Sequence, residues 1–226
     1  MSDLFVTLVP LIVASALVPI QIIITILLLR APSGRITAVA WVAGMTAVRL
    51  LQGLVFGLMF KAGSSDPTDT ARSGTIVSVV LLVLAILFYV VAAKQLLKHP
   101  DEDAPPPRWM AMLDGVTPVK ALLLGMALIA IGAKFWVFTL GAIGAIGADG
   151  LGQPGATIAF LLFVVLVQSV NLTVVGYAYA APARADAVLG RFSDLLKRYN
   201  GPIMIVLGLV FGTWFLVKAL SGLGII

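Results

Sequence analysis

The chain has 226 residues, of which 61% are hydrophobic and only 11% are charged, and its mean hydropathy is +1.11. This composition indicates an integral membrane protein and excludes an ordinary soluble domain. The absence of cysteine excludes disulfides, thiolate metal sites and thiol-based electron transfer. The net charge of +5 does not indicate nucleic-acid binding, because the basic residues fall mostly in short loops between apolar segments.

Six apolar segments follow one another along the chain. A helix needs about 20 apolar residues to cross the hydrocarbon core of a bilayer. The segments long enough to do so are residues 4–29, 36–60, 74–97, 119–146, 156–180 and 202–222. We therefore predict an all-α integral membrane protein with six transmembrane helices. The first segment has no preceding basic residue and stays apolar as far as Leu29, so we expect an uncleaved span and not a signal peptide.

The loops between these segments differ in their content of lysine and arginine. Ten basic residues lie in or beside the loops after the first, third and fifth spans: Arg30, Arg35, Lys94, Lys98, Arg108, Lys120, Arg184, Arg191, Lys197 and Arg198. The other side has only Lys61, Arg72 and Lys218. The positive-inside rule predicts that the basic loops are cytoplasmic and that both termini lie outside.

The third loop divides the chain into two halves of three spans. Its acidic, proline-rich segment, "HPDEDAPPPRWM", predicts an extended cytoplasmic linker over residues 98–118. The halves, residues 1–97 and 119–226, each cross the membrane an odd number of times, so we expect opposite orientations, as in 3+3 inverted-repeat transporters. In the second half, residues 186–200 predict a basic amphipathic helix along the inner membrane surface.

Two full charges lie within the predicted spans. Arg49 is near the middle of the second span and Lys134 is near the middle of the fourth. Each costs about 2.5–3.5 kcal/mol at the bilayer centre, and each surrounding apolar residue offsets about 0.3–0.6 kcal/mol of that cost. No Asp or Glu lies inside any predicted span, so neither cation has a buried counter-ion in its own chain.

Uncharged polar residues lie at similar depth in the spans: Gln21, Gln52, Gln168 and Asn171. Gln52 is three residues from Arg49, and Asn171 is three from Gln168, so each pair shares a helix face. Two interpretations are open. The polar groups hold helices together through backbone hydrogen bonds, or they line a substrate-binding cavity in which the two cations attract an anionic group. Two unpaired cations with four polar neighbours favour the second interpretation.

Two positions predict interruptions in the helices beside these residues. Pro19 removes a backbone donor from the first span, and Gly132 loosens the fourth span next to Lys134. The first and fourth spans occupy corresponding places in the two halves, where broken helices are typical of a midplane binding site. Close helix packing explains the glycine equally well.

The polar residues also argue against other activities. The single histidine, His99, lies in a loop and the spans contain no carboxylate, so we predict no metal site and no relay through buried acids. Ser169 and Tyr177 have no histidine or acid beside them that would activate a nucleophile. We therefore expect no enzyme activity, no catalytic residues and no cofactor.

Three segments resemble a known family. They are "PRWMAMLDGVTPVKALLLGMAL" (residues 107–128), "ASALVPIQIIITILLL" (residues 14–29) and "LLKRYNGPIM" (residues 195–204). They resemble the approach to the fourth span, the first span and the approach to the sixth span of the peptidoglycolipid-addressing, or sulfolipid-addressing, protein family of the lysine-exporter superfamily. That family tends to carry an Asn-Pro-Lys-Asn-like break in its fourth span. The matching positions, Gly132 to Phe135, keep only Lys134.

The resemblance implies a multi-pass plasma-membrane protein of actinobacteria that helps to move a cell-envelope glycolipid, preferably an acidic or sulfated one, toward the cell surface. It implies the glycolipid and other membrane lipids as partners, beside a larger lipid exporter or a lipid biosynthetic enzyme, and no nucleic acid. A homo-oligomer is compatible with the sequence, which does not fix the oligomeric state. Two alternatives stay open: an exporter of amino acids or other small anionic or zwitterionic solutes, and a non-transporting scaffold subunit of a larger lipid exporter.

Overall fold

The computed structural model describes residues 2–30, 34–63, 68–97, 113 and 115–225. All regular structure in these residues is helical: α1 (Ser2–Ala16), α2 (Pro19–Leu29), α3 (Gly34–Gly63), α4 (Thr68–Leu97), α6 (Pro118–Ile131), α7 (Ala133–Ala148), α8 (Gly155–Val167), α9 (Ser169–Ala180), α10 (Pro182–Arg198) and α11 (Asn200–Gly222). The predicted all-α class is confirmed. Most of the predicted linker, residues 98–112 and 114, lies outside the described residues.

The described part of the chain contains between three and six candidate membrane spans. Helices α3, α4 and α11 are each long and apolar enough to cross a membrane. Three helix pairs meet the same test together and are bent between their members: α1–α2 by 46°, α6–α7 by 70° and α8–α9 by 57°. If each pair forms one span, the six segments are those expected from hydropathy. The inverted repeat and its orientation across the membrane stay predictions.

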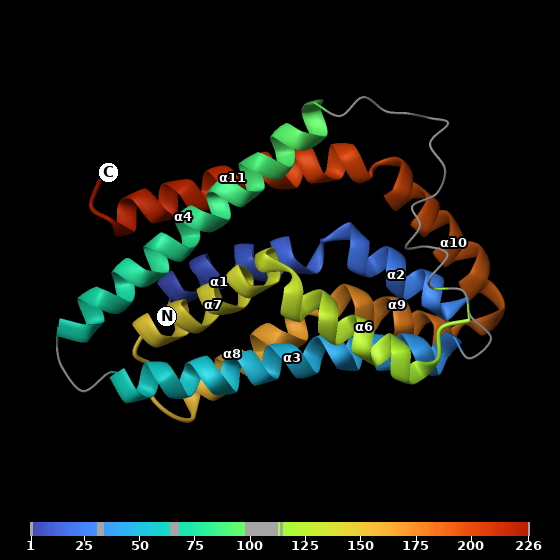
Figure 1. Ribbon diagram of the computed structural model, residues 1–226, viewed down its shortest axis with the longest axis horizontal. Coiled ribbons are helices and arrows are strands. Elements are labelled where there is room, and N and C mark those ends of the chain that lie inside the picture. Colours follow the sequence, from blue (N-terminus) through green and yellow to red (C-terminus); the bar gives the residue numbers. More distant parts are fainter. Residues whose placement is uncertain (1, 31–33, 64–67, 98–112, 114, 226) are drawn as a thin grey trace.

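Most helices extend along the long axis of the molecule, and α10 runs across one end (Figure 1). Helix α4 packs along α11 on one side of the molecule, and α3 packs along α6 on the other, with α1, α2 and α7 between them. The N- and C-terminal ends lie together at the end of the molecule opposite α10. That arrangement agrees with an even number of crossings.

The surface is apolar and the interior contains polar groups. Ile131 is 82% exposed and Val210 is 59% exposed, whereas Arg49, Gln21 and Asn171 are completely buried. Exposed aliphatic side chains of this kind match a hydrocarbon solvent, in which polar groups must find their partners inside the protein. The chain is therefore a membrane protein.

Two glycines allow α3 and α6 to approach closely. A Cβ atom at Gly44 would overlap the carbonyl oxygen of Leu122, and a Cβ atom at Gly125 would overlap the carbonyl oxygen of Trp41. Small residues at both positions therefore bring the two backbones into contact, as is common between membrane helices. This contact fixes the position of α3, which carries Arg49, against the first half of the α6–α7 pair.

Helix α10 closes one end of the bundle. Proline at its first position suits a helix start, and Lys197 and Arg198 in its last turn interact favourably with the helix dipole. Leu189 and Leu196 pack against α2 and α9, whereas the neighbouring Phe192 and Leu195 stay exposed. Helix α10 covers most of residues 186–200, and its apolar residues divide between a buried face and an exposed one. Its location along the inner membrane surface stays a prediction.

Candidate functional site

The break between α1 and α2 exposes a backbone carbonyl that a side chain then satisfies. Pro19 has no N–H, so the carbonyl oxygen of Ser15, four residues earlier, receives no helical hydrogen bond. The side-chain amide Nε2 of Gln21 donates to this oxygen instead. Both residues are completely buried. The break therefore places a buried glutamine and serine at the centre of the bundle.

A chain of hydrogen bonds joins this region to α9 and α3. The hydroxyl of Thr25 on α2 donates to Oδ1 of Asn171 at 2.9 Å. Nδ2 of Asn171 donates to Oε1 of Gln168 at 3.2 Å, and Nε2 of Gln168 is 3.4 Å from Oγ1 of Thr46 on α3. Gln168 itself occupies the bend between α8 and α9. These hydrogen bonds thus connect α2, α9 and α3 through polar side chains in the interior.

Arg49 is buried without a neutralising group among the described residues. Its exposed fraction is 0%, and its Nη2 donates one hydrogen bond of 3.3 Å to the hydroxyl of Ser15. Its Nε and Nη1 atoms have no hydrogen-bond partner in the described part of the chain. The guanidinium carbon lies 5.9 Å from the centre of the Phe135 ring. Arg49 therefore has two free donors facing the interior.

Lys134 approaches the same aromatic ring from α7. Its Nζ lies 5.1 Å from the centre of the buried Phe135 ring, and its side chain is half-buried. Gly132 separates α6 from α7 and begins the new helix with φ −73° and ψ 99°. At this break, the indole N–H of Trp136 donates to the carbonyl oxygen of Ala130 at 2.7 Å. Arg49 and Lys134 therefore both lie close to the ring of Phe135.

Gln52 lies one turn after Arg49 on α3. It is 4% exposed, and both atoms of its side-chain amide have no partner among the described residues. The structure therefore contains two linked groups of predicted residues: Gln21, Arg49 and Lys134 around Ser15 and Phe135, and Gln168 with Asn171 around Thr25. In the described part of the chain, the side-chain amide of Gln52 makes no hydrogen bond with either group.

Several residues at this site were absent from the sequence-based prediction. Ser15, Thr25 and Thr46 bond directly to predicted residues, and Phe135 lies beside both cations. Ser15 had a detectable signal, because it precedes Pro19 by four residues and so carries the carbonyl that proline leaves free. No such signal marked Thr25 and Thr46 in the sequence, since a threonine in a membrane helix usually bonds its own backbone.

Acidic and metal-binding groups are missing from this interior, as far as the structure describes it. No cluster of three or more His, Cys, Asp or Glu side chains is found among the described residues. The buried polar side chains among the described residues are those of Arg49, three glutamines, one asparagine and several serines and threonines. Such a set supplies hydrogen-bond donors to an anion and donors and acceptors to hydroxyl groups.

A family model matches almost the whole chain. The model of Sap, the sulfolipid-1-addressing protein, matches residues 8–221. The chain belongs to this family. The resemblance seen in the three sequence segments is thereby confirmed, and family membership points to lipid addressing or transport as the role of the chain. No curated protein and no solved structure matches the chain.

Proposed function

We propose that the protein binds the acidic head group of a cell-envelope glycolipid within the bundle and helps to move that lipid across the plasma membrane toward the cell surface. Arg49 and Lys134 attract the anionic group in this proposal. Gln21, Gln52, Gln168 and Asn171 contact the sugar hydroxyls. Family membership supports a lipid as the cargo.

One observation carries the proposal: the buried guanidinium of Arg49 has two unpartnered nitrogens, Nε and Nη1. A buried charge without partners is strongly unfavourable, by several kcal/mol even after relaxation. The guanidinium presents two edges, Nε with Nη2 and Nη1 with Nη2, and each edge matches two oxygens of a sulfate, phosphate or carboxylate. A bound anionic head group at either edge would satisfy one of the unpartnered nitrogens and neutralise the charge.

The helix breaks supply further positive potential in the same region. Helices α2, α7 and α9 all begin at interruptions, at Pro19, Ala133 and Ser169. The first turn of a helix carries free N–H groups and a partial positive charge, which favour an anion. Helices that begin in mid-membrane serve this purpose in many transporters, and their breaks allow the two parts to move separately.

The proposal is tested by mass spectrometry of the lipids that stay bound to the purified protein. Wild type is expected to retain an acidic glycolipid that Arg49→Gln loses by a factor of about ten or more, because a hydrogen bond to a charged group contributes about 1.5–3 kcal/mol. Lys218→Gln removes a half-buried cation from α11 and serves as the matched control.

Two further variants distinguish a loss of lipid binding from a loss of the fold. Lys134→Gln changes a half-buried residue, so it keeps the fold more easily and is expected to lower lipid retention and surface glycolipid together. Arg49→Lys keeps the charge but not the fork, and an intermediate result is expected. Equal lipid retention and equal surface glycolipid in folded Arg49→Gln would refute the proposal. Efflux of labelled amino acids from loaded vesicles would instead support a solute exporter.

A further inference from the structure

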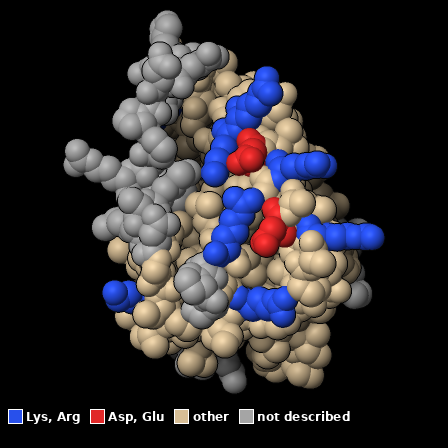
Figure 2. All heavy atoms as spheres, turned by 90° about the vertical axis from the view of Figure 1, so that its right-hand side faces the viewer, with Lys and Arg blue, Asp and Glu red and all other residues tan. Residues whose placement is uncertain are grey.

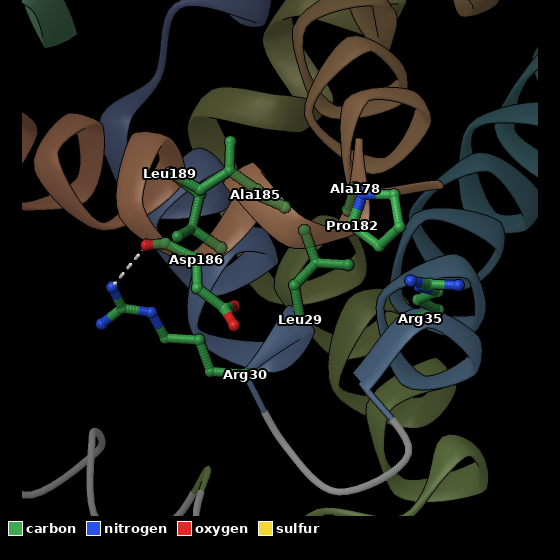
Figure 3. Close-up of a pocket in the computed structure, with 9 residues that line it drawn as sticks. Leu29, Arg30, Arg35, Ala178, Pro182, Ala185, Asp186 and Leu189 are labelled. Carbon is green, nitrogen blue, oxygen red and sulfur yellow. Dashed lines mark hydrogen bonds between the residues drawn. The ribbon is translucent and has the colours of Figure 1, made fainter. Parts of the chain in front are cut away.

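A cavity lies at the end of the bundle that α10 covers, near the C-terminal end of α2 and apart from Arg49. Its volume is about 160 Å³. The end of α2, the first turn of α3, the end of α9 and the start of α10 surround it (Figure 3). Six of the nine residues that line it are apolar, among them Ile26, Leu29, Ala185 and Leu189, although polar atoms form the larger part of its surface.

Two arginines border this cavity, and no described carboxylate forms an ion pair with either. Nη2 of Arg30 donates to the backbone carbonyl of Asp186 at 3.3 Å, and the guanidinium of Arg35 lies 5.4 Å from the centre of the Tyr179 ring. Among the described residues, the one ion pair within 4.0 Å joins Lys197 and Asp194. Most guanidinium donors of both arginines therefore have no partner within the described part of the chain.

Gly190 positions the first of these arginines. A Cβ atom at this position would overlap Nη2 of Arg30, so only glycine leaves room for the guanidinium to cross α10. The carboxylate of Asp186 also borders the cavity (Figure 3). Two guanidiniums and one carboxylate leave an excess of positive charge beside an apolar wall.

The surrounding surface combines positive charge with exposed apolar side chains. Figure 2 shows lysine and arginine side chains gathered over this end of the molecule, with acidic side chains between them. Next to the cavity on α10, Val188 is 46% exposed, Phe192 36% and Leu195 52%. Their spacing of four and three residues places them in one stripe along the helix.

We infer that this cavity binds the phosphate or sulfate of an acidic membrane lipid, with Arg30 and Arg35 holding the head group and the acyl chains lying along the exposed stripe of α10. The cavity is smaller than the roughly 300–1,000 Å³ of a site for a drug-sized ligand, so it admits a head group and leaves the chains outside. A free inorganic ion would use the arginines but would gain nothing from the apolar wall and stripe. Arg30 and Arg35 are separate from the Arg49 cluster, so this site does not depend on the proposed function.

Hydrogen–deuterium exchange of α10 tests the inference, because it reports on this site alone. In nanodiscs of phosphatidylcholine, added phosphatidylglycerol or sulfatide is expected to slow exchange at the start of α10. Arg30→Gln or Arg35→Gln should each raise the lipid concentration needed by about tenfold, since each removes charge-assisted hydrogen bonds. Asp186→Asn should lower the lipid concentration needed, because this substitution removes a negative charge from the cavity edge.

Three controls make the result decisive. Arg184→Gln and Arg191→Gln remove the same charge from exposed positions of α10 outside the cavity, and they should change the required lipid concentration little. Gly190→Ala keeps every charge but displaces the Arg30 guanidinium, so it should weaken binding as Arg30→Gln does. Arg49→Gln tests the interior site separately, and its failure to alter lipid retention would leave this result unaffected. Equal protection in the Arg30 and Arg35 variants, or equal protection of wild type by inorganic sulfate or phosphate alone, would overturn the inference.

Discussion

At the breaks between α1 and α2 and between α6 and α7, a side chain replaces a lost helical hydrogen bond. The two breaks differ in how deeply they are buried. At each break a carbonyl oxygen loses its helical partner, and the side chain six residues later donates to it: Gln21 to Ser15, and Trp136 to Ala130. The first arrangement is completely buried, whereas Trp136 and Lys134 at the second are only half-buried. The first break therefore resembles a fixed scaffold, and the second is better suited to admit a ligand.

The largest effect is expected from a change that fills the second break. In Gly132→Ala the new Cβ would lie 2.6 Å from the carbonyl oxygen of Leu128 and 2.6 Å from the ring of Phe135, so both must move. Overpacking of this kind costs about 3 kcal/mol, the upper end of its usual range, because one neighbour is backbone. Equilibrium unfolding in mixed micelles measures this loss.

Gly147→Ala is the matched control for this experiment. Gly147 lies on α7 like the break itself, and a Cβ there would meet no atom within 4 Å. Alanine in an open helical position should stabilise by about 0.5–1 kcal/mol. If Gly132→Ala were as stable as Gly147→Ala, the Leu128 carbonyl and the Phe135 ring would give way freely, and the close packing at Gly132 would be wrong.

A smaller loss is expected when the buried break loses its donor. Gln21→Leu preserves side-chain volume approximately but leaves the Ser15 carbonyl without the bond that Gln21 supplies. An unsatisfied buried acceptor costs about 2 kcal/mol. Gln95→Leu on α4, where the side chain is half-buried, should change stability by less than about 0.5 kcal/mol and controls for the substitution itself. Unfolding of the two variants at the same detergent fraction would contradict this assignment.

The sequence predicted which polar residues are buried better than it predicted the shape of the helices. Hydropathy located six apolar segments, which correspond to three long helices and three bent helix pairs, because lipid imposes a minimum length on every span. The buried positions of Arg49 and Asn171 followed the rule that polar groups in spans face the interior. The bend at Gln168 was missed, since the segment around it contains neither proline nor a run of glycines, and only tertiary hydrogen bonds of its amide distinguish it.

The positions of the two arginines around the α10 cavity illustrate a second limit. Charge counting assigned Arg30 and Arg35 to one loop and treated them as signals of orientation. Arg30 reaches Gly190 on α10 and Arg35 lies over Tyr179 on α9, and both partners are far away in sequence. Contacts of this kind arise from the packing of α2 against α10 and of α3 against α9, which hydrophobic periodicity does not encode.

The smallest effect is expected from removing the donor at the second break while keeping its ring. Trp136→Phe deletes the N–H that bonds Ala130 and retains an aromatic ring that can still pack edge-on against Phe56, where the ring centres are now 5.8 Å apart. Because this carbonyl lies near the surface of a half-buried break, the loss should be about 1 kcal/mol, below that of Gln21→Leu. Trp214→Phe on α11, at a position 43% exposed, controls for the change of ring size. A loss in Trp136→Phe equal to that in Gln21→Leu would mean that both breaks are equally closed, and the α6–α7 break would then have no special suitability as the point where a ligand enters.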